Sequence, residues 1–206
     1  MNQGRIALIK STDSLSVNRV VEIHVGAFKG FFLTSLGVGF LRLLYSFYVS
    51  SPKSGVFGYF DGNGVLQGFL AFSGDLSGLY KRMIVRRLPL FAWYSLGALV
   101  RNPKIISRLV GALFYPSATK RTEAYVELAS IGVMPDVKSS GIGSKLVSAL
   151  KENVDFSKFE YITCETDAVD NEAANAFYRK NGFVLAREYS TRQGRKMNEY
   201  RFYKEG

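Results

Sequence analysis

The chain has 206 residues, 47% hydrophobic and 14% aromatic, and its 27 Lys and Arg outnumber its 17 Asp and Glu to give a net charge of +10. This composition excludes a chain disordered throughout and suffices for one domain with a real core. The single cysteine, Cys164, excludes an internal disulfide, and with only one histidine beside it no ordinary zinc cluster or other metal site is expected. No signal peptide is visible, and the longest apolar run, 88–100, is shorter than the ~20 residues that span a bilayer, so we expect a cytoplasmic protein.

Apolar periodicity and turn signals predict the elements in chain order. Strands are expected at 5–10, 56–60, 65–72, 125–133, 161–166, 183–189 and 198–203. Helices are expected from Asp13 or Ser14 to about Phe28, from Thr34 or Ser35 to Pro52, at 141–153 and at 171–181, with two more inside 74–122 that break near Asn102-Pro103. This order predicts an α/β fold with a mixed sheet.

Two local signals sharpen this prediction. The run Asp61-Gly-Asn-Gly between two strands is typical of a β-hairpin, and Gly182 can end the helix before it in a left-handed conformation. An aromatic loop is expected at 31–33. The helix after it should turn four side chains to the core: Phe40, Leu43, Leu44 and Phe47.

Positive charge is concentrated in one segment. Between Asp75 and Glu123 there is no acidic residue, and nine cations lie there: Lys81, Arg82, Arg86, Arg87, Arg101, Lys104, Arg108, Lys120 and Arg121. We treat 74–122 as a basic, aromatic helical insertion within a single domain, 1–206. It indicates either an anionic partner or a solvated surface that serves solubility.

A glycine-rich turn links the strand at 125–133 to the next helix. The residues Lys138-Ser-Ser-Gly141-Ile-Gly143-Ser144 allow a sharp turn and leave backbone amides exposed at a helix start, where they can bind phosphate. The turn is neither a Walker A loop nor a dinucleotide fingerprint. Taken alone, it could be an ordinary tight strand–helix turn.

A second motif lies 28 residues after Gly143, and reads Asn171-Glu-Ala-Ala-Asn-Ala-Phe-Tyr-Arg-Lys-Asn-Gly-Phe183. The two motifs together resemble the GNAT superfamily of acyl-CoA-dependent N-acetyltransferases. The first follows the family pattern Arg/Gln-x-x-Gly-x-Gly/Ala, except that Lys138 replaces Arg or Gln. The second follows Asn-x-x-Ala-x-x-x-Tyr-x-x-x-Gly-Phe at every fixed position. The resemblance implies a mostly antiparallel sheet flanked by helices, and acetyl-CoA as cosubstrate.

The resemblance also assigns a coenzyme site. Amides of the turn would hold the pyrophosphate, the pantetheine arm would pair with the central strand, and the second motif would border the arm near its sulfur. The residues so implied are Ile131, Gly132, Val133, Lys138, Ser139, Ser140, Gly141, Ile142, Gly143, Ser144, Asn171, Ala174 and Tyr178. Asn171 can also be a plain helix N-cap.

Three side chains are candidates for proton transfer. Tyr178 would lie near the sulfur and could protonate the departing thiolate, although it could equally be a core aromatic. The attacking amine must lose a proton, and Glu127 on the central strand stands where some protein-modifying members carry a base. His24, on the inward face of the first helix, is the other candidate. A surface glutamate and a core histidine are the plainer interpretations of these two.

The acceptor is less defined by the sequence. The basic and aromatic insertion favours an anionic small-molecule amine, and our leading hypothesis is a nucleotide-linked amino sugar of the bacterial surface-polysaccharide type. A protein or peptide amine is the alternative acceptor. A non-catalytic module that binds membrane or nucleic acid through 74–122 is the alternative class. We expect no nucleic-acid partner, possible contact with a membrane surface, and a monomer or homodimer.

Overall fold

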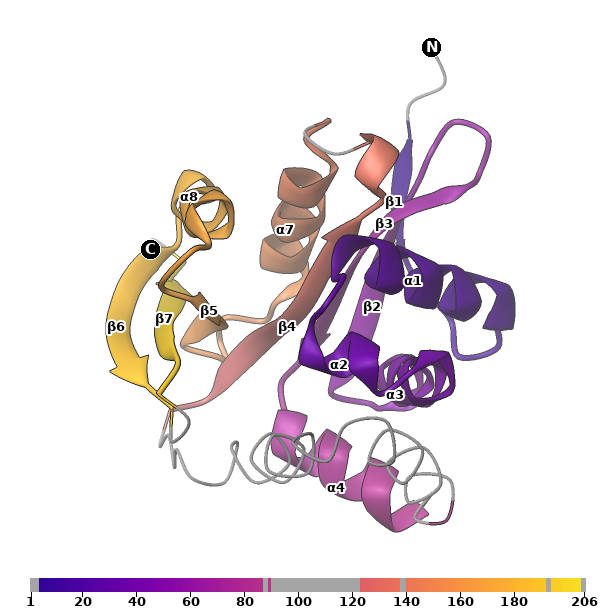
Figure 1. The fold of residues 1–206 in the computed structure, drawn as a ribbon, viewed down its shortest axis with the longest axis horizontal. Helices are drawn as coiled ribbons and strands as arrows, with labels where there is room; N and C mark the ends of the chain where they lie inside the picture. The colour runs from indigo at the N-terminus through magenta and orange to yellow at the C-terminus, as the bar shows by residue number, and fades with distance from the viewer. Residues whose placement is uncertain (1–3, 87–88, 90–122, 138–139, 192–193, 205–206) are drawn as a thin grey trace.

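The computed structural model describes residues 4–86, 89, 123–137, 140–191 and 194–204 (Figure 1). Its strands are β1 (Arg5–Leu8), β2 (Ser54–Phe60), β3 (Leu66–Ser73), β4 (Tyr125–Val133), β5 (Tyr161–Asp167), β6 (Val184–Ser190) and β7 (Lys196–Phe202). Its helices are α1 (Ser14–Ala27), α2 (Phe32–Ser35), α3 (Val38–Ser50), α4 (Leu76–Arg86), the 3-10 turn η1 (Pro135–Val137), α7 (Ile142–Asn153) and α8 (Glu172–Lys180).

All seven described strands form one sheet, in the order β1-β2-β3-β4-β5-β7-β6. Every neighbouring pair is antiparallel except β4 and β5, which are parallel. The mixed, mostly antiparallel sheet is therefore confirmed. The predicted hairpin joins β2 and β3, where the Asp61 carboxylate accepts hydrogen bonds from the amides of Asn63 and Val65, both at 2.9 Å.

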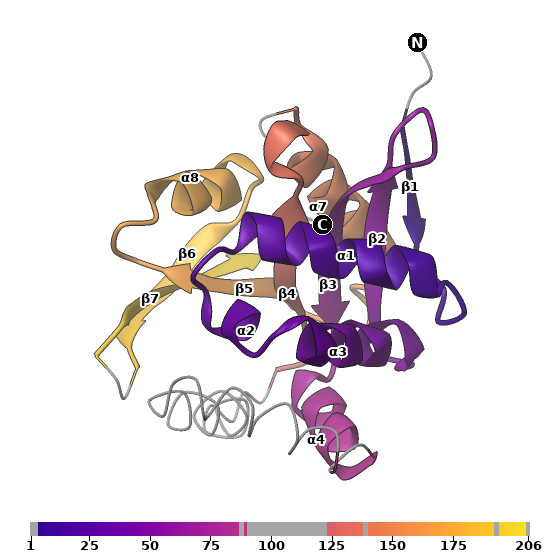
Figure 2. The ribbon, with the colours of Figure 1, turned by 45° about the vertical axis from the view of Figure 1, so that its right-hand side comes forward.

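Helices cover both faces of the sheet. Helices α1, α3 and α4 contribute to one hydrophobic core with Val56 and Phe69, whereas α7 and α8 share a second core with Phe57 and Leu70. Neighbouring strand residues thus point to opposite cores, as the pleat requires. Figure 2 shows α1 and α3 lying across the first face, and α7 behind the sheet.

The predicted second helix is wrong in its start, and its predicted inward face is incomplete. Residues 32–35 form α2, and α3 begins only after Gly37, whose positive φ of 91° suits a residue without a side chain. Its fully buried side chains are Phe40, Leu41, Leu44, Tyr45 and Tyr48, whereas Leu43 and Phe47 are only partly buried. The apolar pattern does not predict that Tyr45 and Tyr48 face the core, because their hydroxyl groups make them less hydrophobic than the neighbouring apolar residues.

Other local predictions are confirmed. Asp13 caps α1 by accepting a hydrogen bond from the Ser16 amide at 2.9 Å, and Gly182 follows α8 with a φ of 74°. Only the α4 part of the basic insertion is described. The predicted break at Asn102-Pro103 and six of the nine cations lie outside the described residues. Within the ranges that the structure describes, no helix is both long and apolar enough to cross a membrane.

Candidate active site

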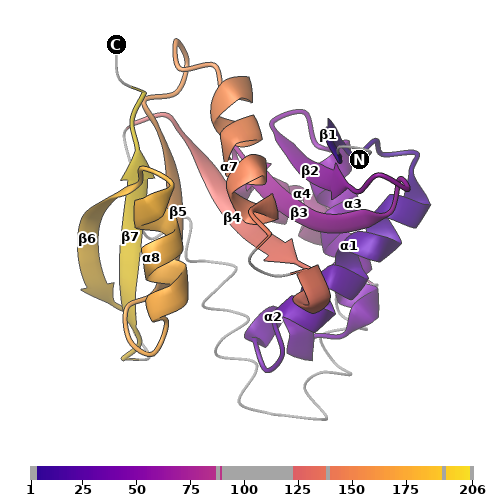
Figure 3. The ribbon, with the colours of Figure 1, turned by 90° about the horizontal axis from the view of Figure 1, so that it is seen from above.

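The central strand β4 has one edge that is only partly paired. Among the described residues, its register with β5 covers Tyr125–Glu127 alone, while its other edge stays paired with β3 as far as Val133. Figure 3 shows β4 and β5 running apart beyond that point. The open edge can therefore accept an extended ligand as an added strand.

A β-bulge interrupts β4 where the two strands part. Ser130 lies opposite Ala71 and Leu128 opposite Phe72, so that β4 has one extra residue, Ala129. A bulge bends a strand and re-aims its side chains. As a result, two successive residues face the α1 side: Ala129 packs against the core there, and Ser130 lies near the Tyr45 hydroxyl, whereas Leu128 belongs to the α7 side.

Helix α7 follows the glycine-rich turn and begins after a glycine at its N-cap. Its N-cap, Gly141, is left-handed with a φ of 81° and offers no side-chain cap. The first amides of a helix have no partner inside it, and the helix dipole makes this end attractive to anions. Gly143 has a second role, because a Cβ there would lie 3.1 Å from the Phe177 ring of α8. This glycine therefore lets α7 approach α8 closely.

The start of α8 is fixed to the end of β5. Asn171 occupies the N-cap position without a side-chain cap bond, and its Nδ2 instead donates to Thr166 Oγ1 at 2.6 Å. The Asn175 side chain donates to the carbonyls of Asp167 at 2.9 Å and Asn171 at 2.8 Å. The sequence analysis missed Asn175, which is buried and whose amide oxygen also accepts bonds from Asn198 and Tyr200.

The predicted coenzyme residues that the structure describes lie in three places. Strand β4 holds Ile131, Gly132 and Val133. The start of α7 holds Ser140, the N-cap Gly141, and then Ile142, Gly143 and Ser144 in the first turn. Helix α8 begins after its N-cap Asn171 and contains Ala174 and Tyr178. Lys138 and Ser139 lie outside the described residues. The open strand edge and the free amides suit an extended, diphosphate-bearing coenzyme.

Tyr178 is buried inside the second core, with 8% of its surface exposed. Its ring packs on Phe183 and Tyr200, with centroids 5.8 Å away in both cases. Burial raises the pKa of its hydroxyl well above the usual value, and the neighbouring Cys164, to which the hydroxyl donates a hydrogen bond, raises it further. The phenol is therefore protonated near neutral pH, as an acid must be before it donates.

Glu127 is half-buried on β4, beside two phenols from different helices. Burial, the neighbouring Tyr80 and the Glu127 charge raise the pKa of Tyr48 on α3 well above its usual value. Burial and then the same carboxylate raise the pKa of Tyr80 on α4 to about 12. Both phenols therefore remain neutral near pH 7.

His24 lies deeper, with 2% of its surface exposed. Its Nδ1 is 2.7 Å from the Tyr45 hydroxyl, while its Nε2 is buried with no hydrogen-bond partner among the described residues. Burial lowers the pKa of His24 to about 4. The ring is therefore neutral near pH 7 and a weak proton acceptor, so this geometry does not favour His24 as a base.

The sequence analysis missed the polar groups around these two candidates. Tyr45, Tyr48, Tyr80 and Ser130 line the α1 side of β4, and none belongs to a motif. Spacing could have found two of them, because Tyr45 and Tyr48 follow Leu41 and Leu44 at helical intervals. Ser130 shares this face only because of the bulge, which no sequence signal announces.

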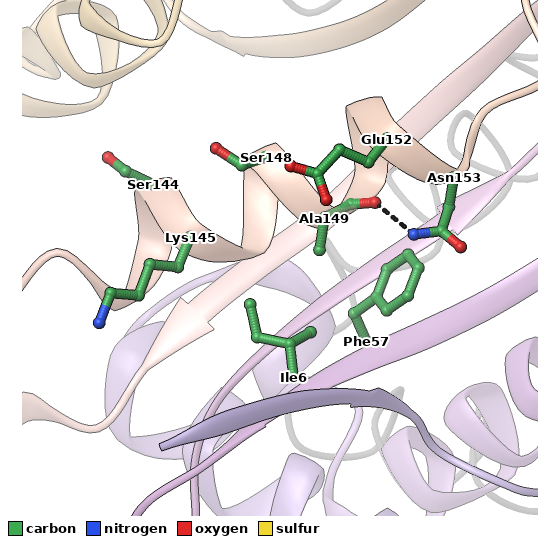
Figure 4. A pocket seen from close by; sticks show the side chains of 8 residues that line it. All are labelled: Ile6, Phe57, Ser144, Lys145, Ser148, Ala149, Glu152 and Asn153. Atoms are coloured by element: carbon green, nitrogen blue, oxygen red, sulfur yellow. Dashed lines mark hydrogen bonds between the residues drawn. The ribbon is translucent and has the colours of Figure 1, made fainter. Parts of the chain in front are cut away.

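A separate groove of about 460 Å³ runs beside α7 (Figure 4). It is lined by Ile6, Phe57, Ser144, Lys145, Ser148, Ala149, Glu152 and Asn153. Ser144 is the only predicted coenzyme residue among them. The groove thus lies between α7 and the β1–β2 edge, away from the contact of Gly143 with α8.

Comparisons with known proteins agree with this arrangement. A family model described as the acetyltransferase (GNAT) family matches residues 41–183. A solved N-acetyltransferase from Staphylococcus aureus Mu50 aligns over 98% of both chains at a TM-score of 0.58 and 15% identity. The alignment with the ribosomal-protein-S18-alanine N-acetyltransferase from Escherichia coli covers 98% of this chain and 94% of that chain, with a TM-score of 0.53 and 16% identity. The alignment with a spermidine N-acetyltransferase mutant from Vibrio cholerae covers 98% of this chain and 95% of that chain, with a TM-score of 0.56 and 13% identity. The comparison with curated proteins gives no match.

Proposed function

The chain belongs to the GNAT acetyltransferase family and uses acetyl-CoA, and from this premise we propose that Glu127 and Tyr178 move the protons in acetyl transfer to a primary amine. The observation that carries the proposal is that β4 has no β5 partner among the described residues after Glu127, and that the N-terminus of α7 lies beyond its end. The nucleophile, the thioester and the pyrophosphate can then be held along one strand.

Each residue has a distinct task in this proposal. The amides of the first α7 turn hold the pyrophosphate, and the free edge of Ile131–Val133 aligns the pantetheine arm. Glu127, directly or through water, takes a proton from the ammonium, since an amine with a pKa near that of lysine is mostly protonated at pH 7. Tyr178 gives its proton to the departing thiolate and is reprotonated from water.

Turnover of acetyl-CoA with a panel of primary amines tests this function directly. The panel should contain nucleotide-linked amino sugars, peptides with free amino termini and polyamines, with release of the free thiol as the readout. We expect transfer to at least one amine class, and a Tm that rises with the concentration of acetyl-CoA. A chain that neither binds acetyl-CoA nor releases thiol with any amine would contradict the proposal.

Replacing Tyr178 by phenylalanine should lower kcat about tenfold or more while the affinity for CoA stays nearly constant. The substitution keeps the ring packing and removes only the acid. Tyr161→Phe is the matched control, because Tyr161 is equally buried at the start of β5, where β4 and β5 are still paired. If Tyr178→Phe keeps the wild-type kcat when chemistry limits the rate, Tyr178 is a packing residue.

For the acceptor, we propose an anionic small molecule, with a nucleotide-linked amino sugar as leading candidate. What supports this is the acid-free basic segment after β3. In its described part, Lys81 and Arg86 are exposed on α4, whereas Arg82 is held by an ion pair to Asp75 at 3.2 Å. Charge-assisted contacts to a diphosphate contribute about 1.5–3 kcal/mol each when they are shielded from solvent, and less when they are exposed. A protein or peptide amine remains the alternative acceptor.

The double variant Lys81→Gln with Arg86→Gln should raise the acceptor KM about fivefold and leave the acetyl-CoA KM unchanged, since each exposed contact is worth less than a buried one. Lys180→Gln with Lys196→Gln removes two exposed cations from α8 and β7 and should change neither constant. A rise in the acetyl-CoA KM alone would show that the segment reads the coenzyme. Loss of co-sedimentation with anionic vesicles, with both constants intact, would favour a membrane role.

A further inference from the structure

His24 and Tyr45 form a buried polar pair in an otherwise aromatic environment. The Nδ1–Oη distance is 2.7 Å, and the two residues are 2% and 1% exposed. The His24 ring lies 4.7 Å from the Phe28 ring and 6.4 Å from that of Phe69, measured between centroids. Burying two polar side chains costs free energy that their mutual hydrogen bond offsets only in part, so apolar residues would stabilise a plain core better.

The pair reaches β4 at the bulge. The Tyr45 hydroxyl lies 3.5 Å from Ser130 Oγ, a long contact that can tighten when the strand takes its ligand. Two residues further on, a Cβ at Gly132 would lie 2.9 Å from the Phe69 ring and 3.2 Å from the Phe28 ring. Phe28 and Phe69, whose rings pack against His24, therefore also pack closely against β4 at Gly132. Ser130 and Gly132 flank Ile131, in the segment whose other edge is open.

We propose that His24 and Tyr45 are a positioning pair, which holds the β4 bulge so that the amides of Ile131–Val133 meet the acetyl end of the coenzyme. Neither residue touches the reacting atoms. The pair orients a strand amide toward the oxygen of the thioester carbonyl. This oxygen gains negative charge when the amine attacks, so the hydrogen bond from the amide strengthens, and a small misorientation of the amide weakens it. The inference rests on the proposed function, because it assumes that this strand segment receives the thioester arm.

The neutral state of His24 fits this task. The groups that face its ring come from α1, α3 and β3 and are Phe28, Tyr45 and Phe69, none of which is charged. A neutral imidazole keeps one nitrogen as donor and the other as acceptor, so it can hold the Tyr45 hydroxyl in one orientation. The pair should thus keep its geometry over the whole pH range in which Glu127 works.

Tyr45→Phe isolates the pair, since it removes one hydroxyl and keeps the ring against Phe69. We expect kcat to fall about tenfold, the effect of one neutral hydrogen bond, and the Kd for CoA to stay within about threefold. His24→Asn, whose amide can replace Nδ1, should retain most of kcat, and His24→Gln, whose amide replaces Nε2, should not. Tyr161→Phe controls for loss of a buried phenol.

A second readout does not need the acceptor. Acetyl-CoA labelled with carbon-13 at the thioester carbonyl should shift its NMR signal on binding, because a hydrogen bond polarises the carbonyl. Tyr45→Phe and His24→Gln should return this signal toward its free position, while His24→Asn should not. A lower Tm with kcat and carbonyl signal unchanged would overturn the positioning role. Wild-type protein that fails to bind acetyl-CoA would overturn the proposed function instead, and this inference with it.

Discussion

Ser144→Asp should weaken the binding of CoA about 100-fold and leave the fold intact. Ser144 lies in the first turn of α7, next to the free amides that we assign to the pyrophosphate. A carboxylate there would repel a diphosphate at short range, and a 100-fold loss corresponds to about 2.7 kcal/mol. The same charge stabilises a helix start, and α7 has no acidic residue in its first turn, so the variant should be at least as stable as wild type.

This choice of residue follows from the packing. Gly143 is nearer the centre of the turn, but a side chain there would meet Phe177 and would disturb the α7–α8 contact as well as the ligand. Ser148→Asp adds the same charge one turn further along α7, on the same groove, and should weaken binding far less. Titration calorimetry with CoA measures both variants, and Tm values check their folds. Equal affinities for Ser144→Asp and wild type would place the pyrophosphate elsewhere.

Glu127→Gln should lower kcat about 100-fold near pH 7, the usual scale for loss of a general base. The deficit should shrink as the pH rises toward the pKa of the amine, because the neutral amine then needs no base. The slope of rate against pH should therefore persist at pH values where the wild-type rate has levelled. Tyr48 and Tyr80 cannot take over the proton, since the pKa values of both phenols are raised and they are already protonated.

Glu160→Gln is the matched control, as Glu160 is exposed outside the site. The measurement is the pH dependence of kcat and kcat/KM for both variants, with the same amine and saturating acetyl-CoA. An unchanged profile for Glu127→Gln would transfer the role to His24 or to a water held by backbone carbonyls. For His24 this would require a pKa higher than about 4 in the complex.

Sequence reasoning succeeded where a local rule has one outcome. Asp13 and Gly182 follow capping rules that depend only on neighbouring residues, and the alternating strands fix which residues face which core. The prediction for α3 leaves out Tyr45 and Tyr48, because each carries both a ring and a hydroxyl, and hydropathy counts the hydroxyl against burial. The Tyr45 hydroxyl contacts His24 and Ser130, which are 21 and 85 positions away in sequence, and such tertiary contacts leave no periodic signal.

The sequence predicts the motifs of the candidate site, but it does not predict how deeply their side chains are buried. Gly141 and Tyr178 stand out by spacing, but spacing cannot tell that Tyr178 is 8% exposed or that its hydroxyl meets Cys164. Nor does it show that β4 loses its β5 partner after Glu127. That separation results from the bulge at Ala129 and from the packing of α7 and α8, which are properties of the assembled sheet.

The contact between Cys164 and Tyr178 makes the Cys164 thiol a natural probe of local opening between α8 and β5. Cys164 is the sole thiol of the chain, is 0% exposed, and has its pKa raised well above the usual value by burial. An alkylating reagent can reach it only while α8 lifts from β5, so the labelling rate measures how often this layer opens. If acetyl-CoA binds between β4 and α8, as we propose, it should slow that labelling by the same factor by which it stabilises the closed state. The alkylation rate of Cys164 would then report the opening of α8 without an introduced label.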